Sequence, residues 1–91
     1  MHSRRRKWPT DLEILAGIEG LAGDGYCPAY DLHLGPFRDR DRAAVRSGLR
    51  RAVSHGLVLE QRGPDGRRYV GIAAEGWRVK NENSASAQRV A

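Results

Sequence analysis

Residues 39–68 constrain the fold of this chain more than any other stretch. The apolar residues Val45, Leu49 and Ala52 recur there at helical spacing, and arginines fill many of the positions between them. Gly56 is a suitable helix stop, and the segments LVLEQR and RRYVGI follow it, joined by a turn at residues 63–66. The stretch therefore predicts a basic helix over residues 41–55, followed by a β-hairpin.

The predicted helix has two unlike faces. Its apolar face suits a core, whereas the opposite face combines Arg46 and Arg50 with the small residues Ser47 and Gly48. No acidic residue lies between positions 42 and 59, although a face that only confers solubility more often mixes both charges. Small side chains let a helix backbone approach a surface closely. This face is therefore suited to a polyanionic partner.

The charge balance of the whole chain points the same way. The chain has 16 lysine and arginine residues against 11 aspartate and glutamate residues, and Lys7 and Lys80 are its only lysines. Arginine forms forked hydrogen bonds to phosphate and to guanine that lysine does not form. A GC-rich genome also enriches arginine, so composition alone leaves both explanations open.

The residues before this stretch predict a basic arm over residues 1–9 and then two helices. Thr10 and Glu13 have capping-box spacing, which starts the first helix. Pro28 begins a second helix of at most two turns that ends at Gly35, and Phe37 anchors the connection that follows. The buried face predicted for the first helix consists of Ile14, Leu15, Ile18, Leu21 and Ala22.

The residues after the hairpin predict a short closing element and a tail. Residues 73–79 are expected to form a turn or short helix whose Trp77 covers the core. Residues 80–91 are small and polar, which predicts a loose tail. The expected organisation is one domain over residues 10–79 between two terminal segments.

The order of these elements resembles the winged helix-turn-helix fold of bacterial transcriptional regulators, the MarR and PadR type most closely. The segments DRAAVRSGLRRAVSHGLV and LEQRGPDGRRYVGIAAEGWRV carry the likeness, which covers residues 10–79. It implies an α+β fold with three helices and a two- to three-stranded antiparallel sheet with one wing. The chain is expected to end before the long terminal dimerisation helices of those families.

The resemblance also implies a function, which is sequence-specific binding of double-stranded DNA by a small transcriptional regulator. The helix over residues 41–55 would lie in the major groove, and the wing at residues 62–68 would lie on the adjacent backbone or minor groove. A homodimer is the default expectation for a protein that reads two half-sites. The residues expected to contact DNA are Arg42, Arg46, Ser47, Arg50, Arg38, Arg40, Arg62, Arg67, Arg68, Arg4, Arg5 and Arg6.

Enzymatic and membrane functions find no support in the sequence. There is no phosphate-binding loop or nucleophile motif, and His2, His33, His55 and Cys27 lack metal-ligand spacing. No catalytic residue, metal, cofactor or small-molecule ligand is therefore expected. A single cysteine, no apolar run of ~20 residues and no secretory leader predict a cytoplasmic protein without a membrane partner.

Two other functions use the same fold. A winged helix can serve as a protein–protein adaptor, for which an apolar patch on the helix or wing would be expected in place of arginines. It can also recognise the shape of RNA, which the arginine-rich arm suits. Base stacking on single strands would need aromatic residues, and Tyr69 is the only candidate on the basic face.

Overall fold

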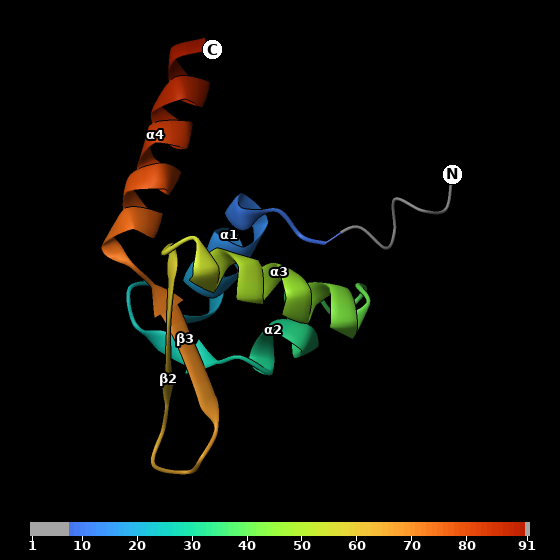
Figure 1. Cartoon of the computed structure of the whole chain (residues 1–91). Coiled ribbons are helices and arrows are strands. Elements are labelled where there is room, and N and C mark those ends of the chain that lie inside the picture. The colour runs from blue at the N-terminus through green and yellow to red at the C-terminus, as the bar shows by residue number, and fades with distance from the viewer. Residues whose placement is uncertain (1–7, 91) are drawn as a thin grey trace.

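The described part of the chain contains four helices and three strands. The computed structural model describes the backbone of residues 8–90 and the side chains of residues 8–83. Within them the elements run α1 (Asp11–Ala22), β1 (Tyr26–Pro28), α2 (Asp31–Leu34), α3 (Arg42–Ser54), β2 (Val58–Arg62), β3 (Arg68–Ile72) and α4 (Ala74–Val90) (Figure 1). The predicted α+β class with an antiparallel sheet is confirmed, and this part of the chain has four helices where three were predicted.

Helix α1 begins with the predicted capping box. The Thr10 hydroxyl accepts a hydrogen bond from the Glu13 amide at 3.1 Å, and the Glu13 carboxylate accepts one from the Thr10 amide at 2.8 Å. The buried face is confirmed at Ile14, Leu15 and Ile18, but the prediction is wrong for Leu21, which is 42% exposed. The last turn of α1 lies beside Gly35, which has no side chain to cover Leu21.

The second helix starts later than predicted. Pro28 belongs to β1, where it is the register partner of Tyr69, and α2 begins only at Asp31. Proline is tolerated at the end of an edge strand because its missing N–H is not needed there. The prediction that α2 is short is confirmed, as is the anchoring role of Phe37, which is buried.

The three strands form one antiparallel sheet in the order β1-β3-β2. The hairpin between β2 and β3 closes as predicted at residues 63–66. The Gly63 amide donates to the Arg67 carbonyl at 2.8 Å, and the Gly66 amide donates to the Gly63 carbonyl at 2.9 Å. Gly66 has φ of 83°, a conformation that side chains disfavour. The hairpin tip therefore projects from the body in a fixed shape (Figure 1).

The core lies between one face of the sheet and helices α1 and α3. Its fully buried side chains include Ile14, Leu15, Ile18, Leu32, Val45 and Val70. Trp77 of α4 packs half-buried against this core, which agrees with its predicted covering role.

Helix α4 is much longer than the closing element predicted from the sequence. It continues to Val90, where composition predicted a loose tail from residue 80 and no long terminal helix. No glycine or proline follows Gly76 to stop it. Arg78 pairs with Glu75 and, at 2.6 Å, with Glu82, and such pairs one turn apart stabilise a helix. Across residues 8–90, no helix combines the length and hydrophobicity that a bilayer span requires.

Candidate nucleic-acid interface

Helix α3 has the two faces that its sequence predicts. Asp41 caps it, since its carboxylate accepts a hydrogen bond from the Ala43 amide at 3.2 Å. Val45, Leu49 and Ala52 are buried in the core, whereas Arg46 and Arg50 are exposed on the opposite side. Among residues 8–83, the structure shows no hydrogen bond or ion pair for Arg46 or Arg50. Both guanidinium groups are therefore available to a partner.

The small residues of α3 divide between these faces. Gly48, expected on the outward face, is buried against the segment before α1: a Cβ there would lie 3.0 Å from Pro9 Cδ. That prediction is wrong because Gly48 stands four residues after Ala44 and four before Ala52, so helical spacing places it on the buried side of α3. Ser47 does lie outward, half-buried, in a shallow hollow that it lines with Trp8 and Arg50.

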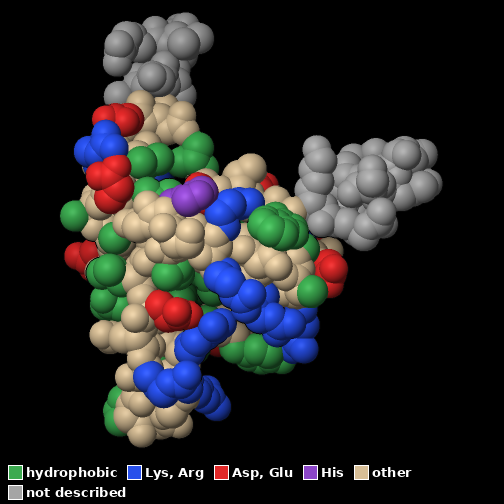
Figure 2. All heavy atoms as spheres, in the orientation of Figure 1, with side chains coloured by type: hydrophobic (Ala, Val, Ile, Leu, Met, Phe, Trp, Pro, Cys, Tyr) green, Lys and Arg blue, Asp and Glu red, His purple; other side chains and the backbone are tan. Residues whose placement is uncertain are grey.

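The hairpin adds three further arginines. Arg62 donates to the Gly66 carbonyl at 2.7 Å and so braces the turn. Arg67 is highly exposed and lies 3.9 Å from Asp65, and Arg68 is half-exposed. Figure 2 shows Lys and Arg side chains as a band that runs from the region of α3 to the hairpin tip. We define the arginine face as the exposed or half-exposed arginines of α3 and the hairpin, which are Arg46, Arg50, Arg62, Arg67 and Arg68.

One acidic residue beside this face was not predicted from the sequence. Glu60 of β2 lies 3.2 Å from Arg68, and both line a small hollow together with Arg46 and Arg50. Strand alternation puts Glu60 on the same side of the hairpin as Arg62 and Arg68, so its place was readable from the sequence. Glu60 partly neutralises the arginines around it.

The other predicted contact residues lie at the margin or elsewhere. The Arg42 guanidinium stacks 4.9 Å from the centre of the Tyr30 ring and donates to the Tyr30 hydroxyl. Arg40 turns toward α1, where it pairs with Glu13 at 3.6 Å, so the structure does not bring it to the arginine face. Arg38 is exposed in the connection between α2 and α3. Arg4, Arg5 and Arg6 lie outside the described residues.

The orientation of α3 is braced at its far end by an aspartate that the sequence analysis did not single out. Asp11, in the first turn of α1, accepts hydrogen bonds from Arg51 at 3.1 Å and from His55 Nδ1 at 2.9 Å. Arg51 also donates to the Pro9 carbonyl and stacks on Trp8. Burial raises the pKa of Asp11, but its bonds to His55 and Arg51 outweigh this and hold the pKa below its usual value.

Asp11→Asn should therefore lower stability. Loss of these partly exposed charged contacts should cost about 1 kcal/mol, or a melting-temperature drop of about 4–8 °C. The pKa of Asp11 is lower in the folded than in the unfolded protein. Its ionised carboxylate therefore adds to folding stability at any pH above its ordinary pKa, and this stabilisation is lost as the pH falls through the pKa of the folded state. Calorimetry at neutral and acidic pH measures both effects, with Asp24→Asn in the exposed turn after α1 as control. Equal melting temperatures for the two variants would contradict this role.

The remaining reactive side chains do not gather. Within the described residues no group of three or more His, Cys, Asp or Glu side chains is placed to hold a metal ion. Cys27 is buried, and burial raises the pKa of its thiol.

Comparisons of this chain with models of known protein families, with curated proteins and with solved structures give no match. The candidate site is therefore defined by its own geometry.

Proposed function

We propose that this protein is a winged helix-turn-helix protein that binds double-stranded DNA in a sequence-specific manner, as a small transcriptional regulator. The observation that carries the proposal is the outward face of α3. It presents Arg46 and Arg50 on either side of the small residue Ser47, and the nearby Glu60 forms its ion pair with Arg68 and not with these two arginines. An α-helix fits the major groove, where arginine forms paired hydrogen bonds with guanine.

The hairpin supports the same proposal, with β2 and β3 acting as the wing. Its arginines continue the band that starts on α3 (Figure 2), and the exposed Arg67 stands next to the rigid turn. Side chains in this position suit the phosphates next to the groove that α3 enters. The number of arginines on this face favours nucleic acid over a protein partner, because protein–DNA interfaces are much more positively charged than protein–protein interfaces.

A binding selection on random duplex DNA tests this proposal. An enriched motif containing guanine is expected, and two inverted half-sites in it would indicate that the protein binds as a homodimer. With six to ten phosphate contacts, affinity for the motif should fall roughly 10³–10⁵-fold between about 50 and 200 mM salt. A folded protein that fails to bind duplex DNA at low salt, or that prefers an RNA of the same sequence, would refute it.

Glu60→Gln should strengthen binding to every duplex. The change removes the negative charge beside Arg68, which frees that arginine for a phosphate. Affinity should rise about fivefold for the selected motif and for random DNA alike. This factor corresponds to about 1 kcal/mol, the effect expected from removing one partly exposed charge. Fluorescence anisotropy with both duplexes measures it. Glu75→Gln is the matched control, since Glu75 is also paired with an arginine but lies on α4; the same gain in both variants would contradict a local effect.

A further inference from the structure

The shallow hollow on the outward side of α3 exposes an aromatic side chain beside the arginine face. Its lining consists of Trp8, Ser47, Arg50, Arg51 and Ser54, none of which is acidic. We call it the Trp8 hollow. Trp8 is 51% exposed, so a large part of its indole is open to solvent in the described structure. Tryptophan provides one of the largest apolar contact surfaces of any side chain, and it is often found where a protein meets a partner.

The contacts that brace α3 also hold this indole in place. The Arg51 guanidinium lies 5.7 Å from the centre of the Trp8 ring, and Arg51 is itself held by Asp11 and by the Pro9 carbonyl. Pro9, the next residue along the chain, is buried. A side chain that is already held in one position loses little conformational entropy when a partner covers it. The exposed indole is therefore preorganised as a contact surface.

The polar groups around the indole suit an anionic partner. Arg50 belongs both to the Trp8 hollow and to the arginine face, and Ser54 is exposed one turn further along α3. Guanidinium groups and serine hydroxyls are frequent donors to the phosphate oxygens of DNA, and the indole N–H is a donor as well. An aromatic surface next to such donors matches a sugar–phosphate unit, which presents a deoxyribose and an anion together.

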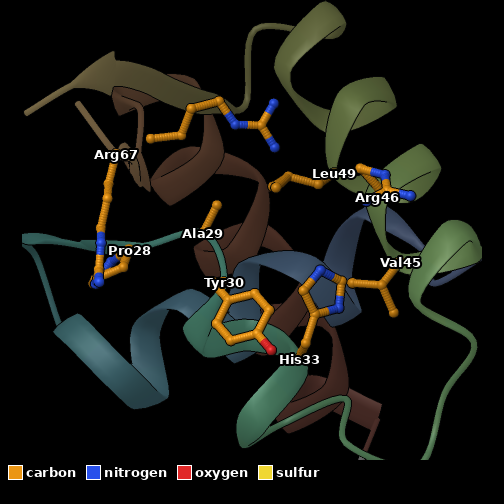
Figure 3. A pocket seen from close by; sticks show the side chains of 9 residues that line it. Pro28, Ala29, Tyr30, His33, Val45, Arg46, Leu49 and Arg67 are labelled. Atoms are coloured by element: carbon orange, nitrogen blue, oxygen red, sulfur yellow. The ribbon is translucent and has the colours of Figure 1, made fainter.

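The hollow on the hairpin side of α3 lacks an open apolar surface (Figure 3). Its apolar lining includes Ala29, Val45 and Leu49, and each of these residues is at most 7% exposed. Arginines surround that hollow, but a sugar would find no aromatic or aliphatic surface in these three side chains. The Trp8 hollow offers both an accessible ring and hydrogen-bond donors.

Resting on the DNA binding proposed above, we propose that the Trp8 hollow binds the sugar–phosphate backbone next to the groove that α3 enters. The indole of Trp8 packs against a deoxyribose, and the Ser54 hydroxyl donates a hydrogen bond to the adjoining phosphate. Contacts with the backbone position a protein on the duplex but do not read its sequence. Trp8 and Ser54 therefore add affinity for every duplex and leave the sequence preference to other residues of α3.

Tryptophan fluorescence tests this contact directly, because Trp8 and Trp77 are the only tryptophans in the sequence. In the variant Trp77→Phe all tryptophan emission comes from Trp8. The neutral quencher acrylamide should quench this emission strongly in the free protein and much less when random duplex DNA is bound at low salt. The control is Trp8→Phe, which leaves only Trp77, half-buried against the core. Quenching of Trp77 should not change when DNA is added.

The second test is affinity. Trp8→Ala should weaken binding to the selected motif and to random duplex by the same factor, roughly tenfold, because the open half of the ring no longer contributes apolar contact. Ser54→Ala, which removes one exposed hydroxyl and no packing, should weaken both by about threefold. Tyr26→Ala is the matched control, since it removes an aromatic side chain that is 42% exposed on β1. It should leave both affinities unchanged, and melting curves verify that every variant is folded.

The outcomes separate this inference from the proposed function. Equal quenching of Trp8 in the free protein and in the DNA complex would overturn the inference and leave the proposed function intact. A loss in Trp8→Ala that is confined to the selected motif would also overturn it, because Trp8 would then contact a base. A folded protein that binds no duplex DNA would overturn both.

Discussion

The double variant Arg46→Ala/Arg50→Ala should bind its selected DNA motif roughly 10²–10⁴-fold more weakly than the original protein. Each paired contact between arginine and guanine contributes about 1–3 kcal/mol of discrimination, and these two side chains are the exposed cations of the outward face of α3. Binding to random duplex should weaken far less, because the arginines of the hairpin remain. Fluorescence anisotropy with both duplexes measures the ratio of the affinity for the motif to the affinity for random DNA.

The matched control for this variant removes the same charge elsewhere. Arg78→Ala/Lys80→Ala also deletes two cations, but both residues lie on α4. It should weaken binding to the two duplexes by a similar small factor through long-range attraction alone. If the α3 variant lost affinity equally for the motif and for random DNA, then Arg46 and Arg50 would contact phosphates and not bases.

Gly76→Ala should lower the melting temperature by about 8–16 °C. A Cβ at this position would lie 2.3 Å from the Leu57 carbonyl oxygen and 2.8 Å from Ile72 Cγ2, so α4 must move away from the sheet. Overpacking of this kind costs about 3 kcal/mol, of which the better helix propensity of alanine returns about 1 kcal/mol. A net loss of about 2 kcal/mol corresponds to that temperature shift in a domain of this size.

Gly20→Ala is the control for the packing argument. Gly20 also lies inside a helix, but no atom lies within 4 Å of a Cβ built there. Only the gain in helix propensity remains, so this variant should be more stable by about 1 kcal/mol. Thermal unfolding followed by circular dichroism compares the two. If both variants melted at a lower temperature than the original protein, helix propensity and close packing would not explain the effects of the two substitutions.

Local signals in the sequence predicted much of the fold. The capping box of Thr10 and Glu13, the cap at Asp41 and the turn at residues 63–66 are set by residues close together in the chain. Their chemistry acts over three or four positions, so the sequence alone identifies them. The faces of α3 followed for the same reason, since helical spacing decides them.

Contacts between distant segments could not be predicted in this way. Pro9 covers Gly48, and Asp11 binds Arg51 and His55, across about forty positions of sequence. Arg40 looked like a contact residue because it stands before a basic helix, yet it pairs with Glu13. The hollow lined by His33, Arg46 and Arg68 likewise forms only when α2, α3 and β3 come together. Such features depend on which distant segments pack together, and the spacing of residues along the chain does not reveal this.

The direction of α4 has a practical consequence for any experiment that attaches the protein to a surface or a dye. The helix leaves the domain at the end opposite to the hairpin tip (Figure 1). A tag fused after it would stay clear of the arginine face. Immobilisation through the C-terminal side should therefore preserve the accessibility of α3.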